Sequence, residues 1–534
     1  MNKTAFFFIS FLLFSFSSLA QKKDNLQQRK LQLALYAIDN LYVDPTDQTK
    51  LVEEAIQGMI SHLDPHSNYM DPEQTKALNE PLQGNFDGIG IQFNMLNDTL
   101  YVIQVVPGGP SEEVGVMAGD RIITVNDTII AGVEAKNSLI MKKLRGKKGS
   151  IVHIGVKRGS SKQLIPFSIT RGKIPVFSID AAYMAAKHIG YIKLNRFAAS
   201  SPREFREAVL KLKKKGMHKL ILDLKGNGGG YLGSAIQLAD EFLTDHKMIV
   251  YTENRDHHRE RAQATARGNF EEGQVVVLVD ETSASASEIL SGALQDWDRA
   301  VIIGRRTFGK GLVQKPIPLP DHSMIRLTVA RYHTPTGRCI QKEYTKGHKT
   351  SYDKDLINRY NNGELMNADS IHFPDSLRFK TLVNKRIVYG GGGIMPDFFI
   401  PIDTTHYSDL HRSLLATGLI NRMTISWVDS HRLEMEKTYK KFKKFQKEFV
   451  VPESLMQQLI SEAKENQIKF VAEQYNISKS IIKIQMKALI ARDLYSVNEY
   501  FQIINEENQS LQKALEIITD DDLYTKTLGS TEQE

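Results

Sequence analysis

The middle of the chain alternates short apolar runs with segments of helical spacing. Several apolar runs have the length and composition of buried strands: residues 189–194, 220–224, 275–279, 301–304 and 324–332. Helix-like spacing occupies residues 201–215 and resumes near Leu232. Because strands that alternate with helices build a sheet with helices on its faces, this pattern predicts an α/β core. We place that core at residues 175–402.

The segments on either side of the core predict other kinds of structure. Apolar positions recur at helical intervals in residues 31–42 and 51–63, and again over most of the C-terminal part. Between these parts, residues 81–174 alternate extended apolar runs with glycine and proline turns, as β-rich domains do. A chain of 534 residues is longer than one hydrophobic core usually organises. We therefore expect a multidomain protein, with helical regions at residues 21–80 and 403–534.

Residues 1–20 have the pattern of an export signal. Lys3 precedes an apolar stretch at residues 5–16, and small residues lead to Ala20. The apolar stretch is too short to favour an uncleaved membrane anchor. We predict cleavage after Ala20 and export to the periplasm, either free or associated with the membrane. The single Cys339 excludes an intramolecular disulfide.

Charge and composition narrow the function classes only slightly. The formal net charge is +7 and 41% of the residues are hydrophobic. The basic excess is small for a chain of this length, so it does not indicate a nucleic-acid partner.

A serine-rich turn and a lysine between glycines form the strongest candidate site. Residues 283–288 have the sequence Ser-Ala-Ser-Ala-Ser-Glu, and Lys310 follows between two glycines. A lysine accepts a proton from a serine hydroxyl only when burial or nearby positive charge lowers its pKa from about 10.4 toward the working pH. The glycines would allow close backbone approach or positive φ, Leu312 and Val313 could desolvate the amine, and Gln314 could hydrogen-bond it. The pairing indicates a serine nucleophile with a lysine base.

The residues alone do not decide which serine acts. The serine segment and the lysine together resemble the signature of the S41 serine peptidases, the carboxyl-terminal processing proteases, whose nucleophile lies 25 positions before the base lysine. Since 310 − 285 = 25, the resemblance implies Ser285 as the nucleophile. It further implies Gln314 as the third member of the catalytic site, Asp296 as a supporting acidic residue, and a core of the crotonase and Clp-protease type.

The serine segment also fits an ordinary helix start. A serine before the helix and Glu288 in its first turn are common N-terminal caps. This interpretation is compatible with catalysis, because a helix start offers unpaired N–H groups and a positive dipole near a nucleophile.

Acyl transfer also needs hydrogen-bond donors for the oxyanion of the tetrahedral intermediate. Residues 220–224 run directly into the glycine turn 226–230, and such a turn leaves backbone N–H groups pointing outward. The S41 resemblance implies that the N–H groups of Gly229 and Ala286 form the oxyanion hole. The alternatives are a tight turn without a ligand and a phosphate loop; the absence of the Walker spacing disfavours the second.

A second signature lies upstream of the core. Segments 84–93, 105–111 and 119–126, taken in order, resemble a PDZ domain, which we place at residues 81–174. Such a domain binds an extended peptide as an added strand and captures its terminal carboxylate with backbone N–H groups. The resemblance implies a site for the substrate C-terminus formed by Gly88, Ile89, Gly90 and Ile91.

Two further segments match the S41 pattern. Residues 63–67, Leu-Asp-Pro-His-Ser, resemble these proteins, but His66 lies beside a proline and 219 positions from Ser285, so we interpret it as a structural turn residue. The pattern of residues 334–341 resumes only at 392–397. This gap predicts an insertion at about residues 342–390, either a lid or a surface elaboration.

Together these observations predict a secreted serine endopeptidase that recognises C-terminal tails of polypeptides through its PDZ domain and cleaves them. No metal or organic cofactor is expected. The expected partners are polypeptide substrates and an adaptor protein, and the C-terminal helical region is a candidate for homo-oligomer contacts. Two other classes stay open: a PDZ peptide-binding scaffold with a latent peptidase core, and a crotonase-like acyl hydrolase.

Overall fold

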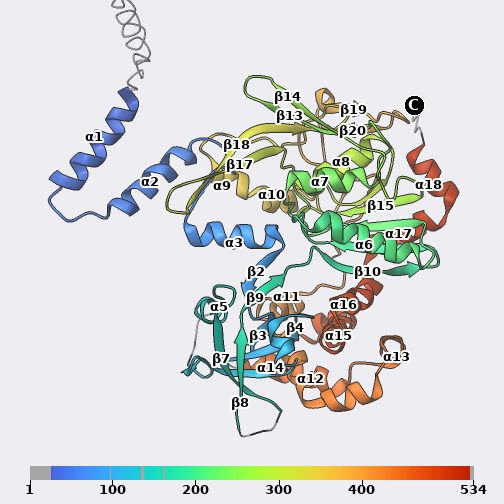
Figure 1. The fold of residues 1–534 in the computed structure, drawn as a ribbon. Helices are drawn as coiled ribbons and strands as arrows, with labels where there is room; N and C mark the ends of the chain where they lie inside the picture. Colours follow the sequence, from blue (N-terminus) through green and yellow to red (C-terminus); the bar gives the residue numbers. More distant parts are fainter. Residues whose placement is uncertain are drawn as a thin grey trace, which may run out of the picture.

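The computed structural model describes residues 26–96, 98–133, 137–159, 161, 163–403 and 405–529, so the predicted export signal lies outside the described residues. Figure 1 shows a large α/β unit, with a β-rich unit and a helical unit below it. Helix α1 (Leu26–Leu41) buries none of its residues and extends away from the rest. The predicted fold class, a multidomain α/β protein with helical N- and C-terminal regions, is confirmed.

The central sheet of the α/β unit is covered on both faces. Its strands follow the order β10 (Ile179–Ala186), β11 (Ile189–Leu194), β12 (Lys219–Asp223), β15 (Gln274–Val279), β16 (Val301–Gly304) and β21 (Phe398–Phe399). All neighbouring pairs after β10–β11 are parallel. The first face packs against α6 (Ser201–Lys213), α7 (Leu232–Asp240) and α8 (Ala286–Asp296). Burial on both faces explains why these strands are almost continuously apolar.

The second face of this sheet is covered by the end of the chain. Helices α17 (Gln509–Thr519) and α18 (Asp521–Leu528) pack their apolar residues against alternate positions of β11, β12 and β15. The sequence predicts a helical region at residues 403–534, and its last two helices pack on the α/β unit. Helical spacing shows that a helix has an apolar face, but it does not show which surface that face covers.

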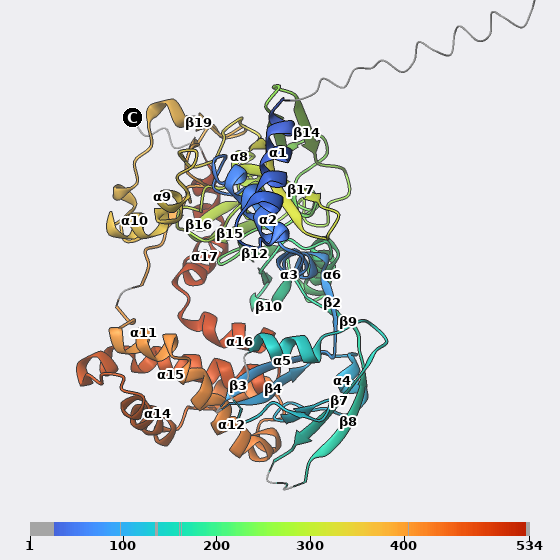
Figure 2. The ribbon, with the colours of Figure 1, turned by 90° about the vertical axis from the view of Figure 1, so that its left-hand side faces the viewer.

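The remaining C-terminal helices have a core of their own. They are α11 (Asp409–Ala416), α12 (Leu419–Thr438), α13 (Phe442–Glu448), α14 (Glu453–Glu465), α15 (Ala472–Leu494) and α16 (Val497–Ile504). Figure 2 shows this bundle beside the β-rich unit. Contact between the two includes an ion pair of Arg121 with Asp429, and Ile425 packed against Tyr101 and Ile103.

The β-rich unit is built on a second sheet, ordered β3 (Ile91–Leu96), β4 (Thr99–Val105), β5 (Arg121–Val125), β7 (Ile151–Lys157) and β8 (Ile165–Thr170). Strand β6 (Thr128–Ile129) pairs with β5, and helices α4 (Pro110–Glu113) and α5 (Asn137–Leu144) complete the unit. Strand β3 pairs only with β4 among the described strands, which leaves its other edge for an added strand. The antiparallel pair β2 (Asn85–Gly88) and β9 (Gly172–Pro175) joins the unit to the rest.

A third sheet brings distant segments next to the serine turn. Its order is β1 (Asn68–Met70), β18 (Met324–His333), β13 (Met248–Asn254) and β14 (Arg259–Gln263), with β17 (Leu312–Pro318) also on β18. Helices α2 (Gln48–Ser61) and α3 (Pro72–Gln83) flank β1 in the chain. The insertion carries α9 (Lys349–Asp353), α10 (Asp355–Asn361), β19 (Arg378–Lys380) and β20 (Ile387–Tyr389).

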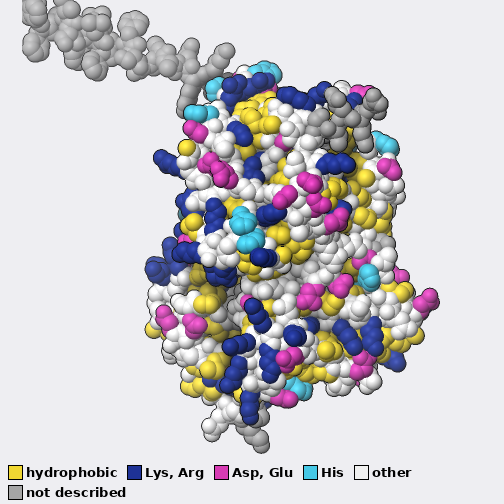
Figure 3. Space-filling view, turned by 90° about the vertical axis from the view of Figure 1, so that its right-hand side faces the viewer, with side chains coloured by type: hydrophobic (Ala, Val, Ile, Leu, Met, Phe, Trp, Pro, Cys, Tyr) yellow, Lys and Arg dark blue, Asp and Glu magenta, His cyan; other side chains and the backbone are white. Residues whose placement is uncertain are grey.

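The surface carries charges of both signs. Figure 3 shows basic and acidic side chains interspersed over the face that it presents. Within the described parts of the chain, no helix is both long and apolar enough to cross a bilayer.

Candidate active site

Ser285 lies at a sharp turn between β15 and α8. Its backbone has φ 55° and ψ −111°, a conformation that non-glycine residues rarely adopt and that costs about 1–3 kcal/mol. The turn is held because Ser285 N donates to Glu288 Oε2 (2.7 Å) while Glu288 N donates to Ser285 O (2.9 Å). A strand-to-helix turn of this kind presents the serine side chain at the edge of the sheet.

The three serines of the segment have different environments. Ser283 is fully buried, and its hydroxyl donates to the carbonyl of Leu224 (2.9 Å). Ser287 is also fully buried, and its hydroxyl donates to the carbonyl of Asn227 (2.8 Å). These two bonds tie the serine turn to the glycine turn, whereas Ser285 lines a pocket. The structure therefore favours Ser285, the position that the family spacing implies.

Lys310 lines the same pocket and is hydrogen-bonded to Gln314. Lys310 Nζ donates to Gln314 Oε1 (2.9 Å), and Gln314 Nε2 donates to the carbonyl of His66 (2.5 Å). Burial, reinforced by the nearby charge of Arg326, lowers the pKa of Lys310 to about 8, and Glu288 opposes this shift. A lysine with this pKa is partly neutral at physiological pH and can act as a general base.

The two glycines around Lys310 serve different purposes, one a positive φ and the other a close approach of backbone. Gly309 has φ +87°. A Cβ on Gly311 would lie 2.8 Å from Gln341 N, which is closer than real contacts allow. One glycine is therefore required by conformation and the other by the close approach of the backbone at Gln341.

Glu288 connects the serine segment to the lysine segment. Its carboxylate is fully buried and accepts four hydrogen bonds, from the N–H groups of Ser285, Gly309 and Lys310 and from the hydroxyl of Thr307. Burial raises the pKa of Glu288, while the four donors favour its ionised form. Backbone N–H groups only donate hydrogen bonds, so the O–H of a protonated Glu288 would find no acceptor among them. This set of donors therefore fits the ionised carboxylate.

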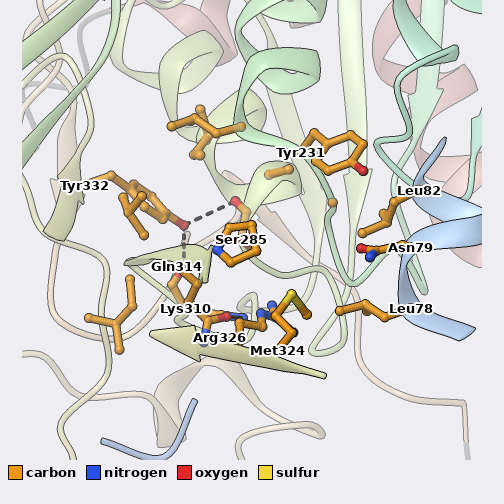
Figure 4. A pocket seen from close by; sticks show the side chains of 17 residues that line it. Leu78, Asn79, Leu82, Tyr231, Ser285, Lys310, Gln314, Met324, Arg326 and Tyr332 are labelled. Atoms are coloured by element: carbon orange, nitrogen blue, oxygen red, sulfur yellow. Dashed lines mark hydrogen bonds between the residues drawn. The ribbon is translucent and has the colours of Figure 1, made fainter. Parts of the chain in front are cut away.

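Tyr332 makes a second connection between the same segments. Its fully buried hydroxyl lies 3.1 Å from the carbonyl of Ser285 and also hydrogen-bonds the carbonyl of Lys310 (Figure 4). The sequence singled out neither Glu288 as a connector nor Tyr332, because both contacts depend on how distant segments pair.

The pocket beside Ser285 is small and largely apolar. Its volume is about 160 Å³, and Ser285, Lys310 and Gln314 all line it. Figure 4 shows Leu78 and Leu82 of α3 on one side. Only Gly84 separates helix α3 from β2, so the wall of the pocket is continuous in sequence with the β-rich unit.

The predicted oxyanion donors lie next to the serine. A Cβ on Gly229 would lie 2.9 Å from Ser285 Cβ and 3.0 Å from Ala286 N, so the two turns are in contact. In this structure, however, the N–H of Gly229 donates to Asn227 Oδ1 (2.9 Å). The N–H of Gly229 can serve an oxyanion only if this bond opens, and its role stays a prediction.

Asp296 does not lie at the pocket. It ends the eleven-residue helix α8, roughly 16 Å along the axis from Ser285. Its fully buried carboxylate pairs with Arg338 (2.7 Å) and accepts from the N–H and hydroxyl of Thr336. The structure therefore gives Asp296 a place in a buried ion pair and not beside the reacting groups.

The Leu-Asp-Pro-His-Ser segment contributes more than the sequence suggested. Asp64 accepts hydrogen bonds from Ser67 and Thr328, which holds the His66 carbonyl against Gln314. His66 Nε2 lies 2.8 Å from the hydroxyl of Tyr352 in the insertion. Burial, followed by the charge of Lys310, lowers the pKa of His66 to about 3. His66 therefore stays neutral and anchors the insertion, as a structural residue would.

The predicted site for a C-terminal tail lies in the β-rich unit, between β2 and the edge strand β3. Ile89 is buried, and Gly90 has φ +77°; a Cβ there would lie 3.1 Å from Ile174 Cδ1. Gly88 ends β2 and Ile91 begins β3. The positive φ of Gly90 allows the tight turn that a carboxylate-binding loop requires.

Comparisons with known proteins identify the domains. Residues 188–350 match the sequence profile of Peptidase family S41, residues 88–168 a PDZ domain, and residues 15–74 the activating protease CtpB N-terminal domain. Residues 410–496 match a family of unknown function.

Individual relatives carry related names. The carboxy-terminal processing protease CtpB of Bacillus subtilis is 35% identical over 317 residues, which is 59% of this chain and 65% of that protein. A probable CtpA-like serine protease of Staphylococcus aureus is 35% identical over 321 residues, 60% of this chain and 64% of that protein. The chain thus spans less than two thirds of the length of these relatives.

Among solved structures, the photosystem II D1 C-terminal processing protease matches 59% of this chain and 90% of its own, with 29% identity and a TM-score of 0.34. On the sequence matches, the strand-and-helix core around Ser285 and Lys310 is a peptidase family S41 domain, and the β-rich unit that precedes it is a PDZ domain.

Proposed function

We propose that this chain is an exported serine endopeptidase that cleaves polypeptides near their C-terminal tails. Ser285 attacks the scissile carbonyl, neutral Lys310 takes the hydroxyl proton and returns it to the leaving amine, and Gln314 orients Lys310. The N–H groups of Ala286 and of the glycine turn, for which Gly229 is the first candidate, stabilise the oxyanion. The PDZ domain captures the substrate's C-terminus at residues 88–91, and the export signal at residues 1–20 directs the chain to the periplasm.

One observation carries this proposal. The only lysine of the pocket beside Ser285, among the described residues, is held by Gln314 in surroundings that lower its pKa to about 8. An ordinary surface lysine would be protonated and useless as a base at neutral pH. The names of the two relatives, a carboxy-terminal processing protease and a probable serine protease, support the same activity.

The test is proteolysis by the purified chain, from residue 21, on a disordered protein that ends in apolar residues. Mass spectrometry of the fragments should show cuts near the C-terminus with the parent and none with Ser285→Ala or Lys310→Ala. Cleavage that persists in Ser285→Ala would contradict the nucleophile assignment. Cleavage by no form, with binding of the tail retained, would favour the scaffold with a latent core, and thioester hydrolysis would favour the acyl hydrolase.

A further inference from the structure

Arg326 is a cation at the candidate active site without an acidic partner. It lies on β18 and lines the pocket with Ser285 and Lys310, half-buried, and burial lowers its pKa. Among the described residues, no Asp or Glu carboxylate forms an ion pair with it. Taking a charge out of water without a counter-ion is unfavourable, so this arrangement requires an explanation.

Other arginines of the same unit have acceptors for their charge: Arg299 donates to the backbone carbonyls of Phe242, Phe270 and Gly273, and two more have carboxylates. Arg338 pairs with Asp296 (2.7 Å), and Arg386 pairs with both Asp298 (2.7 Å) and Asp397 (2.5 Å). The fold therefore supplies carboxylates or backbone carbonyls to arginines that have only a structural role. Arg326 differs in pointing its charge into a pocket that a substrate must enter.

The pocket restricts what could neutralise Arg326. Its walls are mostly apolar, and Figure 4 shows Met324 beside Arg326, with Leu78 of α3 next to Met324. A volume of about 160 Å³ is small beside the roughly 300–1,000 Å³ of pockets for drug-sized ligands. Because Ser285 lines the same small pocket, we expect an anion bound there to belong to a residue within a position or two of the scissile bond. A guanidinium presents a planar fork of donors that matches a carboxylate.

We propose that Arg326 is a specificity-determining residue that binds a carboxylate of the substrate beside the scissile bond. This inference rests on the proposed function and adds the chemical class of the preferred substrate. A cut close to the end of a polypeptide whose C-terminus is not held by the PDZ domain presents the terminal α-carboxylate to Arg326. A cut further inside presents the side chain of Asp or Glu.

The bound carboxylate also affects Lys310. Arg326 lowers the pKa of Lys310, while Glu288 and Asp64 face Lys310 with opposite charge. A carboxylate on Arg326 cancels part of the guanidinium field and so favours the protonated amine. The benefit of the carboxylate is therefore expected in KM, with a kcat at pH 7 that is unchanged or lower.

The experiment compares matched peptides. In one pair, the same peptide ends in a free carboxylate or in an amide; in the other, an amidated peptide carries Glu or Gln at positions flanking the cut. For the parent, kcat/KM should be about 10- to 100-fold higher for the carboxylate member of at least one pair, as expected for a hydrogen bond to a charged group. Arg326→Gln should lower this ratio of kcat/KM values for the carboxylate and uncharged members, and Arg326→Lys should retain more of the ratio than Arg326→Gln.

Ratios within each variant separate this effect from others. A change in the pKa of Lys310 alters both members of a pair, and capture of the free C-terminus by the PDZ domain is common to all variants. The matched control is Arg331→Gln, which removes an exposed arginine from the same strand and should keep the parent's ratios. Loss of the ratio for only one pair identifies the source of the carboxylate as α-terminal or side-chain.

Equal ratios in the parent and in Arg326→Gln, for both pairs, would overturn the inference while leaving the endopeptidase proposal intact. If the parent cleaves no peptide, the proposed function fails first, and binding of the same fluorescent peptides decides the inference. Anisotropy should then show a preference for the carboxylate member of at least one pair that is smaller in Arg326→Gln than in the parent; a preference that is the same in both would refute it.

Discussion

The rate of peptide cleavage should follow the deprotonation of Lys310. Its pKa is about 8, against an ordinary value of 10.5. At pH 7 this makes about one molecule in ten neutral at Lys310, against about one in 3,000 for an ordinary lysine. Burial and Arg326 together therefore increase the competent fraction about 300-fold, equivalent to about 3 kcal/mol.

The pH profile gives the sign and the slope. Only the neutral amine accepts the serine proton, so kcat/KM should rise about tenfold per pH unit between pH 5.5 and 7.5 and level off above about 8. His66 has a pKa of about 3, stays neutral over this interval and should add no inflection near 6.5. The assay is a fluorogenic peptide at constant ionic strength, with the stability of the enzyme checked at each pH.

Two variants test the cause of the shift. Arg326→Gln should move the inflection to higher pH, because the charge that lowers the pKa of Lys310 is gone, and Arg331→Gln should leave it in place. An inflection above pH 10 would refute the desolvated base. A rate that falls between pH 6 and 8 would refute a neutral lysine altogether, and an inflection near 6.5 would indicate an imidazole base.

The remaining predictions concern stability and the supports of the site. Lys310→Met should raise the midpoint of thermal unfolding at pH 7 by an amount equivalent to about 2–3 kcal/mol, because the folded state no longer holds a desolvated amine. This gain in stability is complete below about pH 8 and should vanish as pH rises through 10.5. A gain that does not depend on pH would contradict the prediction. Glu288→Gln turns an amide N–H₂ toward backbone donors, so it should reduce kcat/KM at least 100-fold and lower the midpoint of thermal unfolding. Near-normal activity would show that Glu288 does not join the Ser285 and Lys310 segments. Asp296→Asn should destabilise the core by about 3–5 kcal/mol, because it leaves Arg338 unpaired. The double variant Asp296→Asn/Arg338→Met should recover much of this lost stability in the same unfolding assay. A loss of activity without destabilisation would indicate that Asp296 takes part in catalysis.

Local pattern was sufficient for the elements that carry the serine. Residues 275–279 are a run of branched and apolar residues with no polar position, and they form β15. The small residues of the next segment fit a tight turn, and Glu288 fits the first turn of α8. The choice of Ser285 over its two neighbours came from family spacing, because helix capping and catalysis favour the same residue types.

The rest of the site depends on long-range pairing that a sequence does not display. His66 and Gln314 meet because β1 and β17 both pair with β18, and the register of those pairings places Arg326 beside the lysine. Arg326 is one basic residue in a strand that also contains Arg331, and nothing local distinguishes the two. Only the structure shows that Arg326 lines the pocket and that Arg331 faces solvent.

The strained backbone of Ser285 and the desolvated amine of Lys310 are held in place by the same two side chains, Glu288 and Tyr332. Ser285 has a strained backbone and Lys310 a desolvated amine, and each would relax if its segment moved. Glu288 and Tyr332 bond the backbone of both segments, so neither segment can relax without breaking buried hydrogen bonds that also hold the other. A buried carboxylate that loses its donors is costly, which makes the two strained groups a single cooperative unit. Mutations at these two supports should therefore affect nucleophile and base together, and their effects on kcat should be less than additive.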